Sequence, residues 1–215
     1  CDCQAVVSGG SNPCYHARVA TEKRISLAIE TTCRAGGVAL GRGDAPTEVV
    51  RFDASSRHAT HLVARLRDLL DAAGLRPADV DELYVSTGPG SFTGTRVGVT
   101  VGRSLAQAVP GLKLVSVPTL HAVAMNAAGL DWQHLGVVMD ARERSVCVQW
   151  FHRPDGEIVP DGERTIVPAE QFADSAPGPC VLLGEALEHF DLAAEGIRPG
   201  PAELYLPRPE GVWQL

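Results

Sequence analysis

The sequence predicts an α/β protein built from two βββαβα units that face each other across a cleft. Apolar strands alternate with helical patterns from about residue 25 onward. A weaker copy of this opening begins at 136–140, a run that ends in an acid just as 27–30 does. An internal duplication explains why the two halves of the chain begin alike. We therefore expect a disordered extension over 1–24, a first subdomain over 25–128, and a second subdomain with the C-terminal tail over 129–215.

The first unit has the clearer periodicity. Its long helix is expected to begin at an N-cap, Ser55 or Ser56, and to stop at Gly74. The expected strands are 25–30, 36–40, 47–52, 82–86 and 113–117, and the expected helices are about 56–73, 95–108 and 118–128.

The second unit shows the same alternation more faintly. A strand that ends in an acid and a second alternating strand open it, and shorter elements follow. The expected strands are 136–140, 145–151, 163–167 and 180–183, and the expected helices are 168–174 and 185–190.

Composition narrows the classes of protein. The chain has 215 residues, 45% of them hydrophobic and 21% charged, and no apolar run near the length that spans a bilayer. We therefore expect a soluble protein with no membrane partner. A formal net charge of -7 argues against a protein that grips nucleic acid by itself, since that needs clustered Lys and Arg. Any role with RNA then requires a basic partner.

Cysteine usage favours a cytoplasmic location. The six cysteines lack the regular spacing of a disulfide framework. Cys1, Cys3, Cys14 and His16 offer three thiolates and an imidazole to zinc, but the Gly- and Ser-containing stretch between them favours a flexible tail.

A glycine-rich turn lies between an apolar strand and a helix. Gly88, Pro89 and Gly90 follow the strand at 82–86. Backbone N–H groups of such a turn and the positive end of the helix dipole favour an anion, either a phosphate or a partner's carboxylate. A plain strand-to-helix connection is the alternative.

Several segments, taken in order, resemble the TsaB (YeaZ) family. The resemblance covers about 25–151. The segments that carry it are Ile29-Glu30-Thr31-Thr32, Gly37-Val38-Ala39-Leu40, Arg57-His58 at the start of a leucine-rich helix, Gly88-Pro89-Gly90-Ser91-Phe92-Thr93-Gly94-Thr95-Arg96-Val97-Gly98, and Asp140-Ala141-Arg142.

The resemblance implies a two-subdomain actin-like fold and a role in tRNA modification. TsaB is similar to the catalytic TsaD subunit, which transfers a threonylcarbamoyl group to the adenosine beside the anticodon of certain tRNAs. TsaB itself is a non-catalytic partner of TsaD, and TsaE, an ATPase, joins the assembly. By this resemblance the chain contacts tRNA only through the complex and pairs with a second copy when TsaD is absent.

Two positions separate this chain from the catalytic relative. TsaD binds a metal partly through an H-x-x-x-H pair after the strand that corresponds to 113–117. Thr119 and Val123 hold the matching positions here, and neither can supply an imidazole ligand. We therefore expect no catalytic residue and no metal in the folded region. One feature points the other way, because Glu30-Thr31-Thr32-Cys33 is closer to the opening of TsaD.

Two sets of residues are candidate sites. The first is a weak, vestigial nucleotide site for ATP or ADP, consisting of Glu30, Thr31, Thr32, Gly88, Pro89 and Gly90. The second half has no comparable glycine-rich turn before a helix, so tight binding is not expected. The alternative function is an autonomous nucleotide-dependent transferase or ATPase that uses this site. A homodimeric module unrelated to tRNA is a third interpretation.

The second candidate site is a partner interface. Glycines recur every fourth residue along one helix, and each costs about 1 kcal/mol in a helix relative to Ala, so a compensating close contact is expected. That contact is either another chain or the chain's own sheet. The interface residues predicted by the first alternative, together with the leucine stripe of the preceding helix, are Leu62, Leu66, Leu69, Gly94, Gly98 and Gly102.

Overall fold

Two five-stranded sheets, each with its own layer of helices or turns, make up the molecule. The computed structural model describes residues 24–52 and 58–215, with the side chains of 58–60 excepted. The predicted caps Ser55 and Ser56 and almost all of the predicted N-terminal extension lie outside the described residues. The first sheet consists of β1 (Ile25–Glu30), β2 (Gly36–Arg42), β3 (Ala45–Phe52), β4 (Glu82–Ser86) and β5 (Lys113–Val117), in the order β3-β2-β1-β4-β5.

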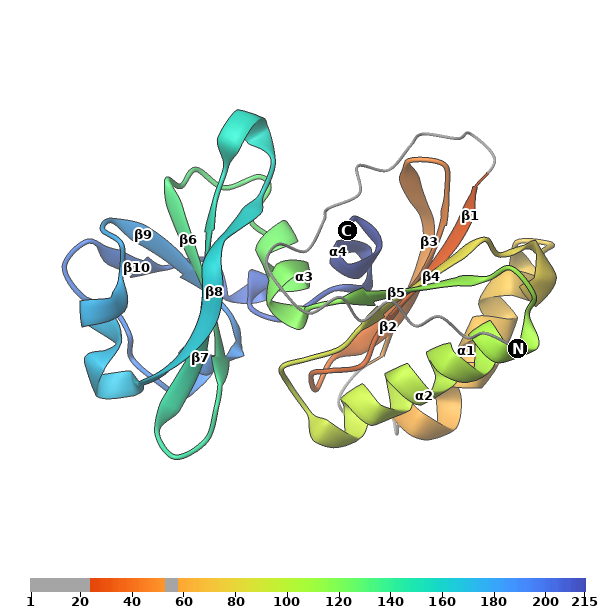
Figure 1. Cartoon of the computed structure of the whole chain (residues 1–215), viewed down its shortest axis with the longest axis horizontal. Coiled ribbons are helices and arrows are strands. Elements are labelled where there is room, and N and C mark those ends of the chain that lie inside the picture. The colour runs from red at the N-terminus through yellow and green to blue at the C-terminus, as the bar shows by residue number, and fades with distance from the viewer. Residues whose placement is uncertain (1–23, 53–57) are drawn as a thin grey trace.

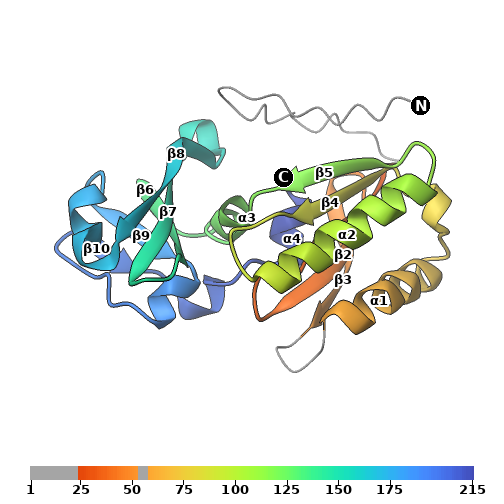
Figure 2. The same ribbon diagram turned by 60° about the horizontal axis from the view of Figure 1, so that its bottom comes forward.

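Helices cover both faces of the first sheet (Figures 1 and 2). Two long helices, α1 (His58–Ala72) and α2 (Phe92–Ala108), pack on one face through a core that includes Leu27, Leu62 and Leu83. Two short helices, α3 (Thr119–Met125) and α4 (Pro209–Trp213), cover the other face. α2 begins earlier than predicted because Ser91 caps it, with Oγ accepting a hydrogen bond from Gly94 N at 3.2 Å.

The second sheet repeats the order of the first. It consists of β6 (His134–Asp140), β7 (Ser145–His152), β8 (Val159–Pro168), β9 (Cys180–Leu183) and β10 (Ile197–Pro199), in the order β10-β9-β6-β7-β8. Read from the other edge this is a meander of three antiparallel strands followed by two parallel strands, as in the first sheet. The duplication predicted from the sequence is therefore confirmed, and the fold is actin-like.

The second unit differs from the prediction in its helices. The expected helices at 168–174 and 185–190 are 3₁₀ segments, Ala169–Ser175 and Glu185–Glu188. Both are shorter than an α-helix needs to be stable by itself, and the tighter i→i+3 pattern suits such short connectors. Three further 3₁₀ turns occupy Pro77–Asp79, Pro154–Gly156 and Ala202–Leu204.

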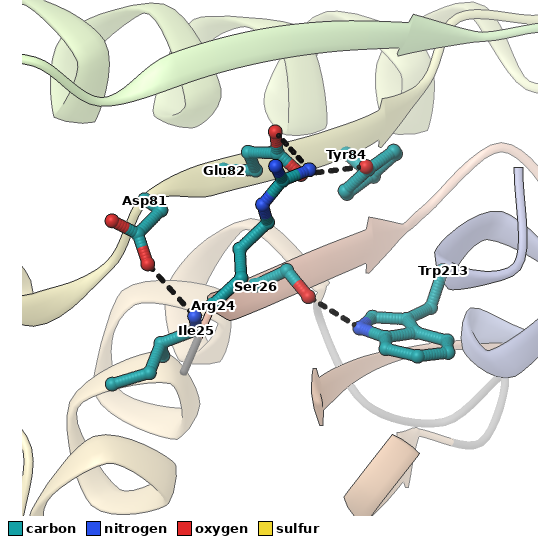
Figure 3. A network of polar contacts seen from close by, with 7 residues as sticks. All are labelled: Arg24, Ile25, Ser26, Asp81, Glu82, Tyr84 and Trp213. Atoms are coloured by element: carbon teal, nitrogen blue, oxygen red, sulfur yellow. Dashed lines mark hydrogen bonds and ion pairs between the residues drawn. The ribbon is translucent and has the colours of Figure 1, made fainter. Parts of the chain in front are cut away.

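The C-terminus returns to the first unit. Trp213 of α4 is 1% exposed, and its Nε1 donates to Ser26 Oγ at 2.7 Å (Figure 3). The fit over β2 is close, because a Cβ atom added at Gly41 would lie 2.1 Å from the Trp213 ring. The predicted division at 128/129 therefore does not describe the packing of α4, which belongs to the core of the first sheet.

The beginning of β1 is fixed to the beginning of β4. Arg24 forms an ion pair with Glu82 at 3.0 Å, and Glu82 also accepts from the Tyr84 hydroxyl at 2.8 Å (Figure 3). The Ile25 backbone N donates to Asp81 at 2.8 Å. These contacts hold the central strands at one end of the sheet, and the candidate nucleotide residues lie at the other end.

Candidate functional site

The loop at the end of β1 lies in the interior of the molecule. Glu30, Thr31 and Thr32 are each 0% exposed. Glu30 Oε1 accepts from the backbone N of Thr32 at 2.5 Å and from its hydroxyl at 2.6 Å. The hydroxyl of Thr31 donates to the Gly94 carbonyl at 2.8 Å. Most polar groups of this loop are therefore bonded within the protein itself, and the exception is Glu30 Oε2, a buried oxygen with no hydrogen-bond partner among the described residues.

The glycine-rich turn packs against that loop. The Gly88–Pro89 peptide is cis, and the backbone N of Ser91 donates to the Thr32 carbonyl at 2.6 Å. A Cβ atom added at Gly90 would lie 2.3 Å from the same carbonyl. The structure thus brings together all six residues of the predicted nucleotide site, but it places the turn on the threonine loop instead of leaving a space between them.

Thr119 joins the loop to the turn. Its hydroxyl accepts from the backbone N of Gly88 at 3.1 Å and donates to the hydroxyl of Thr32 at 3.1 Å. Val123, one turn later on α3, is 0% exposed and belongs to the apolar core shared with the second sheet. The two positions that the sequence analysis compared with the metal-binding histidines of TsaD therefore have structural contacts here.

Burial dominates the electrostatics of this centre. It raises the pKa of Glu30, and the hydrogen bonds from Thr32 offset part of that effect because they favour the carboxylate. His121, also on α3, is 8% exposed and lies edge-on to Phe151 with ring centroids 5.3 Å apart. Its burial, together with the nearby charge of Arg164, lowers its pKa to about 4, so this imidazole is neutral at physiological pH.

The second unit contacts the loop after β1. Cys33 lies 3% exposed among side chains of the second unit, and its thiol contacts the carboxylate of Glu185. Burial is the main reason why the pKa of this thiol lies well above its usual value. The next residue, Arg34, makes a bidentate ion pair with Glu188. The loop after β1 is thus fastened to the 3₁₀ segment that follows β9.

The predicted glycine ridge faces inward. Gly94, Gly98 and Gly102 are buried, and added Cβ atoms would lie 1.9 Å from the Thr31 carbonyl, 2.5 Å from the Thr31 hydroxyl and 2.8 Å from Val85, respectively. The prediction that these glycines contact a partner is wrong, because their missing side chains let α2 approach β1 and β4 of its own sheet. Of the two alternatives that the sequence left open, the structure shows the internal one.

The leucine stripe also faces inward. Leu62, Leu66 and Leu69 are 0%, 4% and 3% exposed and belong to the core between α1, α2 and the first sheet. The prediction that they form a partner surface is wrong for the same reason, since the sheet already covers the apolar side of α1.

The outward side of α1 and α2 carries a different apolar surface. Val63 is 59% and Phe92 is 70% exposed, and the Arg96 guanidinium lies 5.1 Å from the Phe92 ring centroid. A groove of about 400 Å³ follows the junction of the two helices, and a second hollow of about 410 Å³ shares Thr100 and Val101 with it. The sequence contained a signal for this surface, because both residues are large apolar side chains on or beside helix faces not needed for the core.

Neither a metal cluster nor a membrane span is found in the part of the chain that the structure describes. No group of three or more His, Cys, Asp or Glu side chains there is arranged to hold a metal ion. None of the helices described is long and apolar enough to cross a membrane.

The fold and the site together define an actin-like protein. The loop between β1 and β2 packs against the glycine-rich turn and α3 of the same chain. The family model for TsaD, tRNA N6-adenosine threonylcarbamoyltransferase, matches residues 49–179. The solved structure of YeaZ from Pseudomonas aeruginosa superposes with a TM-score of 0.74 at 26% identity, covering 89% of this chain and 90% of that one.

Relatives found by sequence similarity agree with the family model and the solved structure. The tRNA threonylcarbamoyladenosine biosynthesis protein TsaB of Bacillus subtilis is 27% identical over 161 residues, which is 74% of this chain and 69% of that protein. An uncharacterized protein of Mycobacterium tuberculosis is 36% identical over 162 residues, 73% of this chain and 70% of that protein. The chain belongs to the TsaD-like family and, within it, to the TsaB (YeaZ) group.

Proposed function

We propose that this chain is the non-catalytic, TsaB-like subunit of the machinery that installs threonylcarbamoyl on an adenosine of tRNA, and that it acts by pairing with a TsaD-like catalytic subunit. The name of the B. subtilis relative supports the reaction. The net charge of -7 supports contact with tRNA through the complex only.

The observation that carries the non-catalytic role is the bond between Thr119 and Thr32. In an actin-like enzyme the loop after β1 must leave room for nucleotide phosphates. Here Thr32 is 0% exposed and its hydroxyl bonds Glu30 and Thr119. Because Gly94 has no side chain, the start of α2 lies close to the same loop. These contacts support at most a vestigial site for ATP or ADP.

The pairing surface that we propose is the outward side of α1 and α2. It replaces the predicted interface of inward glycines and leucines, of which only Leu66 lines the groove. Val63, Phe92 and the adjoining groove are exposed apolar surface on this side, and apolar surface of this kind is used for binding between proteins. The catalytic subunit binds there, and a second copy of this chain binds there when that subunit is absent. A TsaE-like ATPase joins the assembly, which is cytoplasmic.

The test is reconstitution. The purified chain, a TsaD-like subunit, a TsaE-like ATPase, tRNA and a threonylcarbamoyl donor are combined, and the modified nucleoside is measured with each protein omitted in turn. We expect product only when this chain and the catalytic subunit are both present. Product made without the catalytic subunit, or ATP turnover by this chain alone, would instead support the autonomous transferase or ATPase.

A further inference from the structure

Two histidines of the second sheet lie directly across from each other. His134 begins β6 and His152 ends β7, and the register that pairs Leu135 with Phe151 makes them the next cross-strand pair. Directly opposite residues of antiparallel strands project to the same face, with Cβ atoms about 4.5–5.5 Å apart. The two imidazoles are therefore neighbours at the end of the sheet distant from the β6–β7 turn.

Both rings have a buried nitrogen without a partner. Nδ1 of His134 and Nδ1 of His152 are each buried, and neither makes a hydrogen bond to any residue that the structure describes. Buried polar atoms are nearly always satisfied, so an unsatisfied atom calls for an explanation such as a bound ion or water. Two such atoms in one cross-strand pair point to a single shared ligand.

The chemistry of that ligand follows from the donors. Neutral imidazoles are common ligands of Zn²⁺, Ni²⁺ and Cu²⁺, whereas Mg²⁺ and Ca²⁺ prefer oxygen. Cys180 lies beside His134 on β9, but no group of three metal-binding side chains is present among the described residues. The two imidazoles are then the protein ligands of such an ion.

We propose that His134 and His152 together bind one divalent transition-metal ion of the Ni²⁺, Cu²⁺ and Zn²⁺ class. From the sequence we expected no metal in the folded region and did not consider this pair. The two histidines are far apart along the chain, and only the hairpin register brings them together.

Ni²⁺ is the probe, because it is paramagnetic and does not oxidise the thiols of the chain. Ni²⁺ is titrated into the full-length protein while the histidine ring protons are followed by NMR. Ni²⁺ is added beyond the amount that Cys1, Cys3, Cys14 and His16 can bind, and we then expect the rings of His134 and His152 to shift or broaden together. If those two rings stay unchanged while other histidines respond, the proposal is wrong.

Matched variants give a second measurement. His134→Ala and His152→Ala should each weaken this binding event tenfold or more by calorimetry, because one imidazole of two is lost. The control is His189→Ala, which removes an exposed histidine outside the pair and should leave the event unchanged. Binding by Cys1, Cys3, Cys14 and His16 would persist in all variants. Equal affinity in His134→Ala and the control would overturn the proposal, and the NMR result on the unmodified chain decides it if a variant fails to fold.

Discussion

Thr119 Oγ1 lies 3.1 Å from Thr32 Oγ1 and donates a hydrogen bond to it. This contact joins the start of α3 to the loop after β1, between elements distant in the sequence. The same Thr119 hydroxyl accepts from Gly88 N, so one side chain holds both halves of the predicted nucleotide site together. Thr119 is thus part of the internal support of the loop.

Thr119→Val tests this contact. Valine keeps the shape but leaves the buried Gly88 N–H without its acceptor and removes one of the two hydrogen bonds of the Thr32 hydroxyl, which should lower the free energy of unfolding by about 1–3 kcal/mol. Thr119→Ser retains the hydroxyl and should cost less. Urea unfolding measures both. Equal stabilities for the valine and serine variants would show that the hydroxyl contributes nothing.

Gly98→Leu should strongly destabilise the isolated chain. A Cβ atom alone would lie 2.5 Å from the Thr31 hydroxyl, so a leucine must separate α2 from β1 at a cost of at least about 3 kcal/mol. Circular dichroism and thermal melting measure the loss. Gly129→Ala is the control, because nothing lies within 4 Å of its added Cβ and it should melt like the parent chain. A folded Gly98→Leu protein that had only lost its partner would contradict the inward packing.

The strands and the first unit could be predicted from the sequence because their periodicity is local. β1, β4 and β5 fall at the predicted ranges, since apolar runs of this length between turn residues have few alternatives. The duplication was also visible, because both units open with a strand that ends in an acid, Glu30 and Asp140.

What could not be predicted depends on contacts between distant residues. Glycines on one face of a helix indicate a close contact there, but they do not show whether the contact is with the chain's own sheet or with another chain. The sequence therefore did not decide which of these two Gly98 faces. α4 has only five residues, too few to show a helical period, and its return to Ser26 follows from the fit of Trp213. The ion pair between Arg34 and Glu188 joins the two units and has no local signature.

His121 should make stability depend on pH. Its pKa is lowered from 6.5 to about 4. Between these two pH values the folded state therefore binds fewer protons than the unfolded state. The stabilisation is fully present above pH 6.5 and is lost as the pH falls through 4, up to about 3 kcal/mol in all. Comparing urea unfolding of the parent chain with that of His121→Gln at pH 7.5, 5.5 and 4.5 isolates the effect. A difference between the two proteins that stays constant over this range would contradict it.

ATP should bind weakly. Because the chain itself occupies Thr31 and Thr32, we expect a Kd on the order of hundreds of micromolar or weaker, which corresponds to less than about 5 kcal/mol of binding free energy. Calorimetry with ATP and Mg²⁺ is the measurement, and Glu30→Gln is the control for heat unrelated to this loop. Micromolar affinity that Glu30→Gln abolishes would favour the enzyme interpretation.

Val63 and Phe92 should be required for pairing and not for folding. Their side chains are 59% and 70% exposed, so the double variant Val63→Ser, Phe92→Ser should unfold within about 0.5 kcal/mol of the parent chain. Large apolar side chains near the middle of an interface contribute most of its affinity. The double variant should therefore bind a TsaD-like subunit at least tenfold more weakly, and it should be monomeric at concentrations where the parent chain forms a dimer.

Ile166→Ser is the matched control, because Ile166 is 68% exposed but lies on β8 of the second unit. Sedimentation velocity measures dimer formation, and calorimetry measures binding to the catalytic subunit. If Ile166→Ser abolished pairing and the double variant did not, the partner would bind the second unit and the proposed surface on α1 and α2 would be wrong.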